Sequence, residues 1–257
     1  MQQRMLTSAL GAGCAAWLLA AVLHFAFVQD YILLGEAYES GAAVHYAGVA
    51  PANQAHDEAR GEAGAEAEAG AEAVLPAPLP APTDGQSSLS RIFWTVVFHG
   101  LVYVAYALIL AAGFALAQFF GQRITAKDGL LWGIAGYGAF LLAPAMGLAP
   151  ELPGILAADI GDRQLWWWGT VLATAVGLGL LAYGRGVALV ALAVLVLAVP
   201  HLVGAPALDG FSGVAPPEVA AAFATRVLGT GLAVWALMGW VAGWLWARGD
   251  APLASEP

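Results

Sequence analysis

Long apolar runs are the feature that most constrains this chain. The first run, Leu6 to Val28, contains no Asp, Glu, Lys or Arg. A transmembrane α-helix needs about 20 predominantly apolar residues, so this run fits a membrane-spanning helix. The whole sequence is 60% hydrophobic and 11% charged, whereas soluble domains carry about 25% charged residues. The sequence therefore predicts an integral membrane protein whose main surroundings are the lipid bilayer.

Six apolar runs divide the chain, and they predict an all-α fold. The first transmembrane helix is expected within residues 1–28, and the others at about 93–120, 130–148, 165–183, 187–204 and 226–246. The fifth run is the weakest, because Pro200 cannot continue a helical hydrogen-bond ladder without a kink. We therefore expect a compact bundle of about six transmembrane helices, with five as the alternative. Five of the six helices form a membrane domain over residues 93–248.

Residues 29–92 differ in composition from the rest. They include the acidic, low-complexity stretch EARGEAGAEAEAGAEA and the proline-rich VLPAPLPAP. Such a segment buries too little apolar surface to offset its chain entropy. We expect a long, disordered, acidic loop between the first two helices.

The distribution of basic residues predicts the orientation. With six helices, one side of the membrane receives short segments that contain Arg4, Arg123, Lys127, Arg185 and Arg248. Lys and Arg near helix ends favour the cytoplasmic side. Both termini, including the tail 249–257, are thus expected in the cytoplasm, and the acidic loop outside it. The net charge of −9 makes nucleic acid an unsuitable partner, because binding it requires basic side chains.

Small residues and tryptophans give further expectations about packing. Gly239 and Gly243 are four residues apart in the last helix, a spacing that lets helix backbones approach closely in lipid. The row Ala135, Ala139 and Ala143 predicts the same for the third helix. The tryptophans at 166–168 are expected to anchor the fourth helix at the outer interface.

Three histidines are candidates for metal binding. His24, His99 and His201 lie near the predicted outer ends of three different helices, so the topology places them at similar depth. Ionisable residues inside a membrane are functional candidates by default, and imidazole with carboxylate oxygens suits Co, Ni, Zn or Fe. The alternative is that each histidine only contacts headgroups or a neighbouring helix. No HxxxH or HxH spacing links any two of them.

The connector between the third and fourth helices supplies further carboxylates. Asp159 and Arg163 are four residues apart, which is the spacing of a helical surface ion pair. The functional alternative is that Glu151 and Asp159 are the first contacts for an incoming cation. Elsewhere, the sequence has no phosphate-binding GxxxxGK[ST], no HExxH and no GxSxG motif. We therefore expect neither an enzyme nor a permanently bound cofactor.

Four ordered motifs resemble a known family. They are LAPAMGLAPELPG, AADIGDRQLWWW, VPHLVGAP (Val199 to Pro206) and APPEVAAAF (Ala215 to Phe223). Together they are similar to the CbtA family of predicted cobalt transporter subunits, over most of the chain outside residues 40–90. The resemblance implies a multi-pass protein of the bacterial inner membrane that serves cobalt supply for cobalamin, beside a small single-span CbtB partner. Histidine-rich loops are common in that family, whereas this loop keeps only His45 and His56.

The leading hypothesis is a membrane subunit of a divalent-metal uptake transporter, with cobalt as the favoured cargo. An acidic outer loop would raise the local cation concentration. The metal contacts would come from His24, His99 and His201, with Glu151 and Asp159. The alternative is a structural or assembly membrane protein that organises a partner complex and transports nothing.

Overall fold

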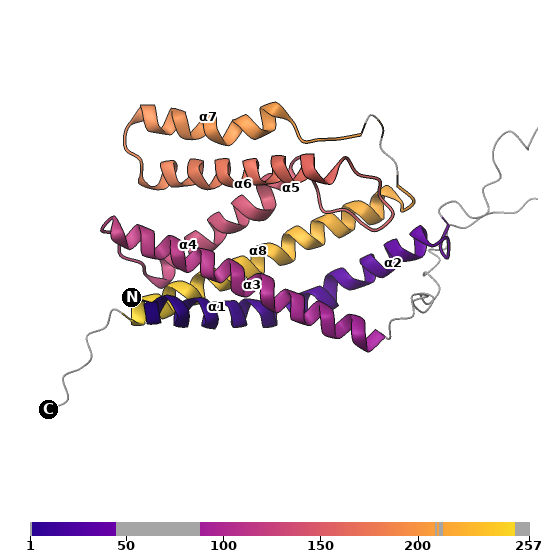
Figure 1. Cartoon of the computed structure of the whole chain (residues 1–257), viewed down its shortest axis with the longest axis horizontal. Helices are drawn as coiled ribbons and strands as arrows, with labels where there is room; N and C mark the ends of the chain where they lie inside the picture. The colour runs from indigo at the N-terminus through magenta and orange to yellow at the C-terminus, as the bar shows by residue number, and fades with distance from the viewer. Residues whose placement is uncertain (1, 45–87, 209, 211–212, 250–257) are drawn as a thin grey trace, which may run out of the picture.

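The computed structural model describes residues 2–44, 88–208, 210 and 213–249 (Figure 1). Within these ranges the regular elements are helices, and no strand is present. Most of the predicted acidic loop, including His45 and His56, lies outside the described residues, as do residues 250–257 of the tail. The prediction of an all-helical membrane protein is confirmed.

The first helix runs from Gln2 to Glu39 without a break. It consists of α1 (Gln2–Leu23), a π-helical turn η1 (His24–Val28) and α2 (Gln29–Glu39). The helix thus continues beyond the apolar run that predicted it, because Val28 and Ile32 pack against Leu152 of the connector and Phe223. It ends before Gly41, whose φ of +76° leaves the helical region.

Five further helical segments follow. They are α3 (Ser88–Phe119), then α4 (Ala126–Tyr137) continued by the π turn η2 (Gly138–Leu142) and α5 (Ala143–Ala145), then α6 (Ile160–Tyr183), α7 (Val187–Val203) and α8 (Pro217–Arg248). By length and composition, four described helices could cross a membrane: Gln2–Glu39, α3, α6 and α8. The fifth predicted helix is α7, which at 17 residues is shorter than those four.

Glycines bring α4 and α8 into backbone contact. A Cβ atom at Gly239 would lie 2.6 Å from the Cα of Gly133, and one at Gly243 would lie 2.8 Å from the Cα of Gly129. Association of helices in lipid depends on close van der Waals packing rather than on the hydrophobic effect. The prediction of a close approach at Gly239 and Gly243 agrees with this contact. Its partners on α4, however, are glycines and not the predicted alanine row.

The helix α1 packs between α3 and α8 through small side chains. Its buried alanines are Ala9, Ala12, Ala16 and Ala20. Two hydrogen bonds reinforce the contact: Ser8 Oγ donates to the Ala242 carbonyl at 2.7 Å, and Trp17 Nε1 donates to the Val96 carbonyl at 2.7 Å. The three helices α1, α3 and α8 therefore form one apolar core.

The α6–α7 hairpin forms a second layer, and α4 crosses between the two layers (Figure 1). Among the described helices, only α6 has Cα atoms within 8 Å of those of α7. Trp166 does not face the membrane interface as predicted; it is buried within the hairpin and donates from Nε1 to the Pro200 carbonyl at 3.1 Å. Trp168 remains about half exposed, at 51%.

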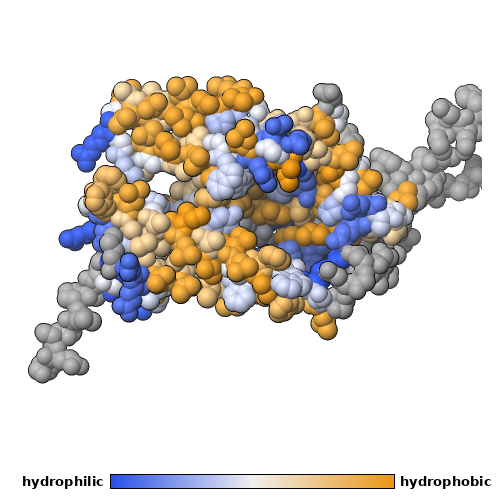
Figure 2. Space-filling view, in the orientation of Figure 1, coloured by the Kyte–Doolittle hydropathy of each residue, from blue (hydrophilic) through white to orange (hydrophobic). Residues whose placement is uncertain are grey.

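The molecule has two distinct ends. At the terminal end, Arg4 of α1 bonds Gln118 of α3, and its guanidinium lies 4.4 Å from the ring centre of Trp246 in α8. At the opposite end, which we call the connector end, α2 stops and α3, α6 and α8 begin (Figure 1). Hydrophilic side chains gather toward these two ends, and apolar ones cover the flanks of the helices (Figure 2).

The glycine contact predicts opposite effects for two Gly→Ala changes in α8. Gly239→Ala should lower stability by about 1–3 kcal/mol, because its Cβ meets backbone that has to move. Gly229→Ala, with no atom within 4 Å of its Cβ, should stabilise the helix by about 0.5–1 kcal/mol. Thermal unfolding in detergent, followed by tryptophan fluorescence, measures both. Equal midpoints for the two variants would contradict the importance of the α4–α8 contact.

Candidate functional site

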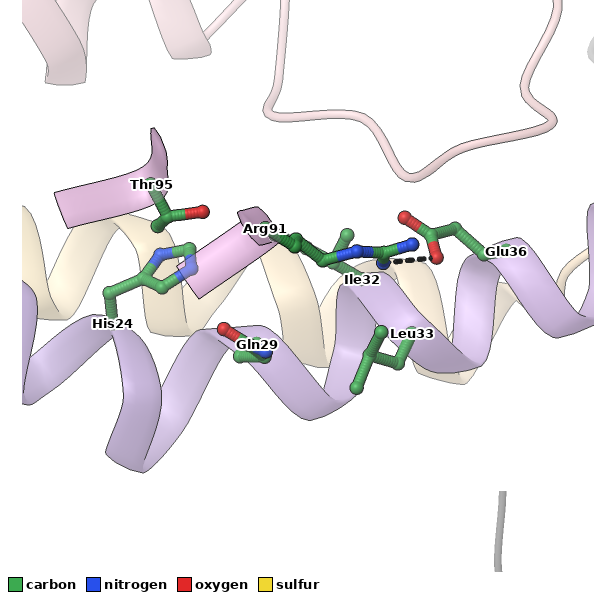
Figure 3. A pocket seen from close by; sticks show the side chains of 7 residues that line it. All are labelled: His24, Gln29, Ile32, Leu33, Glu36, Arg91 and Thr95. Carbon is green, nitrogen blue, oxygen red and sulfur yellow. Dashed lines mark hydrogen bonds and ion pairs between the residues drawn. The ribbon is translucent and has the colours of Figure 1, made fainter. Parts of the chain in front are cut away.

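A pocket of about 280 Å³ opens between the first helix and α3, toward the connector end (Figure 3). The first helix contributes His24, Gln29, Ile32, Leu33 and Glu36, and α3 contributes Arg91 and Thr95. We call it the α1–α3 groove, after the first helix as a whole, although its lining residues on that helix lie in η1 and α2. Most of its lining side chains are polar, although it lies between two of the apolar helices.

One face of α3 supplies the polar side of this groove. Arg91, Thr95 and His99 follow one another at intervals of four residues, and residues four apart share a helix face. Neither Arg91 nor Thr95 is among the site residues predicted from the sequence. The signal that could have found them was this four-residue spacing of polar side chains in an otherwise apolar helix.

The π turn brings His24 to the same place. His24 is the first residue of η1, and its ring centre lies 4.8 Å from that of His99. A metal–nitrogen bond of about 2 Å plus the radius of an imidazole puts a ligand's ring centre roughly 3 Å from the ion, so two ligands of one ion lie roughly 5 Å apart. The observed separation is therefore compatible with both rings binding one ion. Single π turns inside α-helices are frequent at functional sites.

A backbone contact sets the tautomer of His99. Its Nδ1 lies 2.8 Å from the carbonyl oxygen of Thr95. A carbonyl oxygen can only accept, so Nδ1 carries the proton and donates it. In the neutral ring Nε2 then has a free lone pair, which is the arrangement found in histidines that bind metals.

An ion pair lies in the part of the groove nearest the connector end. Arg91 extends along the first helix to Glu36, and its Nη1 is 2.6 Å from Oε2 of that carboxylate (Figure 3). The side chains are 21% and 37% exposed, respectively. Glu36 is twelve positions after His24 in the same helix, which is about 18 Å of helix length. Glu36 and His24 therefore cannot bind the same ion.

Aromatic side chains continue inward from the histidines. The ring of His99 is followed by those of Tyr103 and Tyr106, and Tyr106 contacts Trp235 of α8 with ring centres 4.9 Å apart. Trp235 is 2% exposed, and its Nε1 has no hydrogen-bond partner among the described residues. Phe140 stacks on it at 5.6 Å. This aromatic cluster belongs to the apolar core and reaches the histidine pair through Tyr103.

The third predicted histidine is not part of this site. His201 lies near the end of α7, where its ring contacts Trp166 with centres 6.2 Å apart. Because α7 approaches only α6 among the described helices, His201 is separated from the other two. In the described part of the chain no group of three or more His, Cys, Asp or Glu side chains could share a metal ion. The structure thus brings together two of the three candidates.

The connector carboxylates have partners within the chain. Arg163 does not pair with Asp159 as predicted; its Nη2 lies 2.6 Å from Oε2 of Glu151. Asp159 instead caps α6, and its Oδ1 accepts from the backbone N–H of Gly161 at 2.8 Å and of Asp162 at 3.4 Å. An N-cap carboxylate satisfies N–H groups that have no partner inside the helix. This local demand explains why Asp159 turns to the backbone.

The N-cap role of Asp159 predicts different effects on stability for two substitutions at this position. Asp159→Ala should lower stability by about 0.5–2 kcal/mol, whereas Asp159→Asn, which keeps an acceptor oxygen, should stay near wild type. Neither change should alter metal uptake. Thermal unfolding and radiolabelled Co²⁺ uptake check the two statements. Reduced uptake in a stable Asp159→Asn protein would instead support a direct cation contact by this carboxylate.

The chain was compared with known proteins at the level of families, curated sequences and solved structures. The family model described as "Probable cobalt transporter subunit (CbtA)" matches residues 2–247. No curated protein and no solved structure matches. The matched range takes in the α1–α3 groove, the connector and all the described helices except Arg248, the last residue of α8. The chain therefore belongs to the CbtA family of probable cobalt transporter subunits.

Proposed function

We propose that this protein is the membrane subunit of a divalent-metal uptake transporter, with cobalt as its cargo. The observation that carries the proposal is the His24–His99 pair, of which His24 lines the α1–α3 groove. The family supports a transporter subunit in a membrane, and its description points to cobalt. We further propose a location in the bacterial inner membrane with both termini cytoplasmic, which places the connector end outside.

A site with only two imidazole ligands suits a transported ion, which has to dissociate from the protein after binding. Resident structural metal sites in proteins usually supply four ligands. At this pair, two nitrogens would replace part of the hydration shell, and water or a second chain would fill the remaining positions. Imidazole nitrogen is a suitable ligand for late first-row metals, whereas Mg²⁺ and Ca²⁺ prefer oxygen. The pair therefore favours Co²⁺ over the abundant hard cations.

The filled core next to the histidine pair supports a role for a partner. Beyond His99 the described core is filled by aromatic and small side chains, among them the buried Trp235, Phe114 and Trp246. A subunit by definition works with another chain, and we propose a small single-span CbtB-like protein as that partner. Such a chain would supply the missing ligands or the continuation of the route.

Substitution of the histidine pair tests the proposal. The His24→Ala, His99→Ala double variant should reduce radiolabelled Co²⁺ uptake about tenfold or more in cells that also produce the partner. Even the loss of a side chain that only orients a metal ligand commonly lowers metal affinity by about 10–100-fold. His201→Ala is the matched control, and it should transport like wild type.

Two outcomes would contradict the proposal in different ways. Unchanged uptake in the double variant would exclude the histidine pair as the site. Uptake at background level by the wild-type protein with its partner would exclude transport itself. That second result would favour the alternative role of a membrane protein that only organises a partner complex.

A further inference from the structure

We propose that Arg91 is a tethered cation that occupies the outer carboxylate of the α1–α3 groove, and that divalent metal ions reach the histidine pair by displacing it from Glu36. This inference rests on the proposed function. It assigns a role in selectivity to two residues that are not metal ligands of the pair.

The position of the ion pair is the first argument. Arg91, Thr95 and His99 lie on one face of α3, and both Arg91 and Glu36 line the pocket that also contains His24. The guanidinium reaches along the groove and away from His24 (Figure 3). An ion that moves from the connector end toward the histidines therefore passes Glu36 and Arg91.

The weakness of the pair is the second argument. Both side chains are partly exposed, and exposed ion pairs contribute only about 0.2–1 kcal/mol. A guanidinium stays charged at any physiological pH. The pair is therefore formed in this structure, yet an ion with a stronger attraction to the carboxylate can replace the guanidinium.

The third argument is the charge of the competitor. A side chain tethered near its partner acts at a high effective concentration, in the millimolar range for short flexible links. A free monovalent cation carries no more charge than Arg91 and lacks this advantage. The Coulomb attraction of a divalent ion to Glu36 is twice as large at equal distance. Displacement thus favours divalent ions.

The location of Arg91 in α3 explains why it returns to Glu36. Arg91 lies three residues after Ser88, the first residue of α3. Helix N-termini carry a partial positive charge, so a cation there is unfavourable without a carboxylate nearby. Once the metal ion has moved on to the histidines, Glu36 is again the carboxylate that the guanidinium binds in this structure.

The rate of Co²⁺ binding tests the role of Arg91. The full chain in nanodiscs of uncharged lipid would be mixed with CoCl₂ in a stopped-flow instrument, and the quenching of tryptophan fluorescence would be followed. Arg91→Gln should bind Co²⁺ up to about fivefold faster, because the pair no longer has to be broken. Added NaCl should slow this variant more than the wild type, because without Arg91 the Glu36 carboxylate is open to monovalent cations as well.

The connector offers a matched control. Arg163 pairs with Glu151 at the same 2.6 Å, so Arg163→Gln removes an equivalent ion pair outside the groove and should leave both rates unchanged. Glu36→Gln should slow Co²⁺ binding, and in the Arg91→Gln background it should cancel the gain. These two Glu36 variants keep the test valid if Arg91→Gln alone is poorly folded.

The outcomes separate this inference from the proposed function. Equilibrium ⁵⁷Co²⁺ binding that is lost in the His24→Ala, His99→Ala variant supports the histidine site on its own. If that site holds but Arg91→Gln binds Co²⁺ no faster than wild type, or keeps its gain without Glu36, the role of Arg91 is wrong. If the wild type and the histidine variant bind Co²⁺ equally, the histidine site fails, and this inference fails with it.

Discussion

The backbone contact between α4 and α8 is the constraint on which the rest of this structure depends. Lipid tails are as apolar as the side chains of these helices, so the hydrophobic effect does not drive the helices together. Which helices associate is decided by how closely they pack. Gly129 and Gly133 of α4 meet Gly239 and Gly243 of α8. The same helix α8 also packs against α1, through buried alanines of α1 and the hydrogen bond from Ser8 to the Ala242 carbonyl.

This contact also positions the aromatic cluster beneath the site. Trp235 lies one turn before Gly239 in α8, and a Cβ at Gly136 would collide with its ring. Phe140 in the π turn η2 stacks on the same indole, and Tyr106 meets it from α3. The aromatic cluster next to the histidine pair is therefore a consequence of how α4 crosses α8. A change in that crossing would reach the histidine pair through Tyr106 and Tyr103.

Parts of this architecture were predictable because they follow from local patterns. Apolar runs gave the helices, and the spacing of Gly239 and Gly243 gave the close contact. The proximity of His24 and His99 was predictable from their similar depth in two membrane-spanning helices, because residues at the same depth in neighbouring helices can meet. The choice of Glu151 over Asp159 by Arg163 was not predictable, because it depends on the fold of the connector and on the backbone N–H groups that Asp159 caps. The separation of His201 had the same origin, because no local pattern predicts that α7 packs only on α6 among the described helices.

The π turn at His24–Val28 has a consequence for the first helix as a whole. Its first carbonyl accepts from the N–H five residues later, so this turn contains one residue more than an α-helical turn. Each residue rotates a helix by about 100°. Removing one residue here would therefore leave the packing of α1 against α3 unchanged but would rotate α2. Glu36 would then no longer point toward Arg91 of α3. The phase between the two halves of the helix, and with it the line from the carboxylate to the histidines, is set by a single inserted residue.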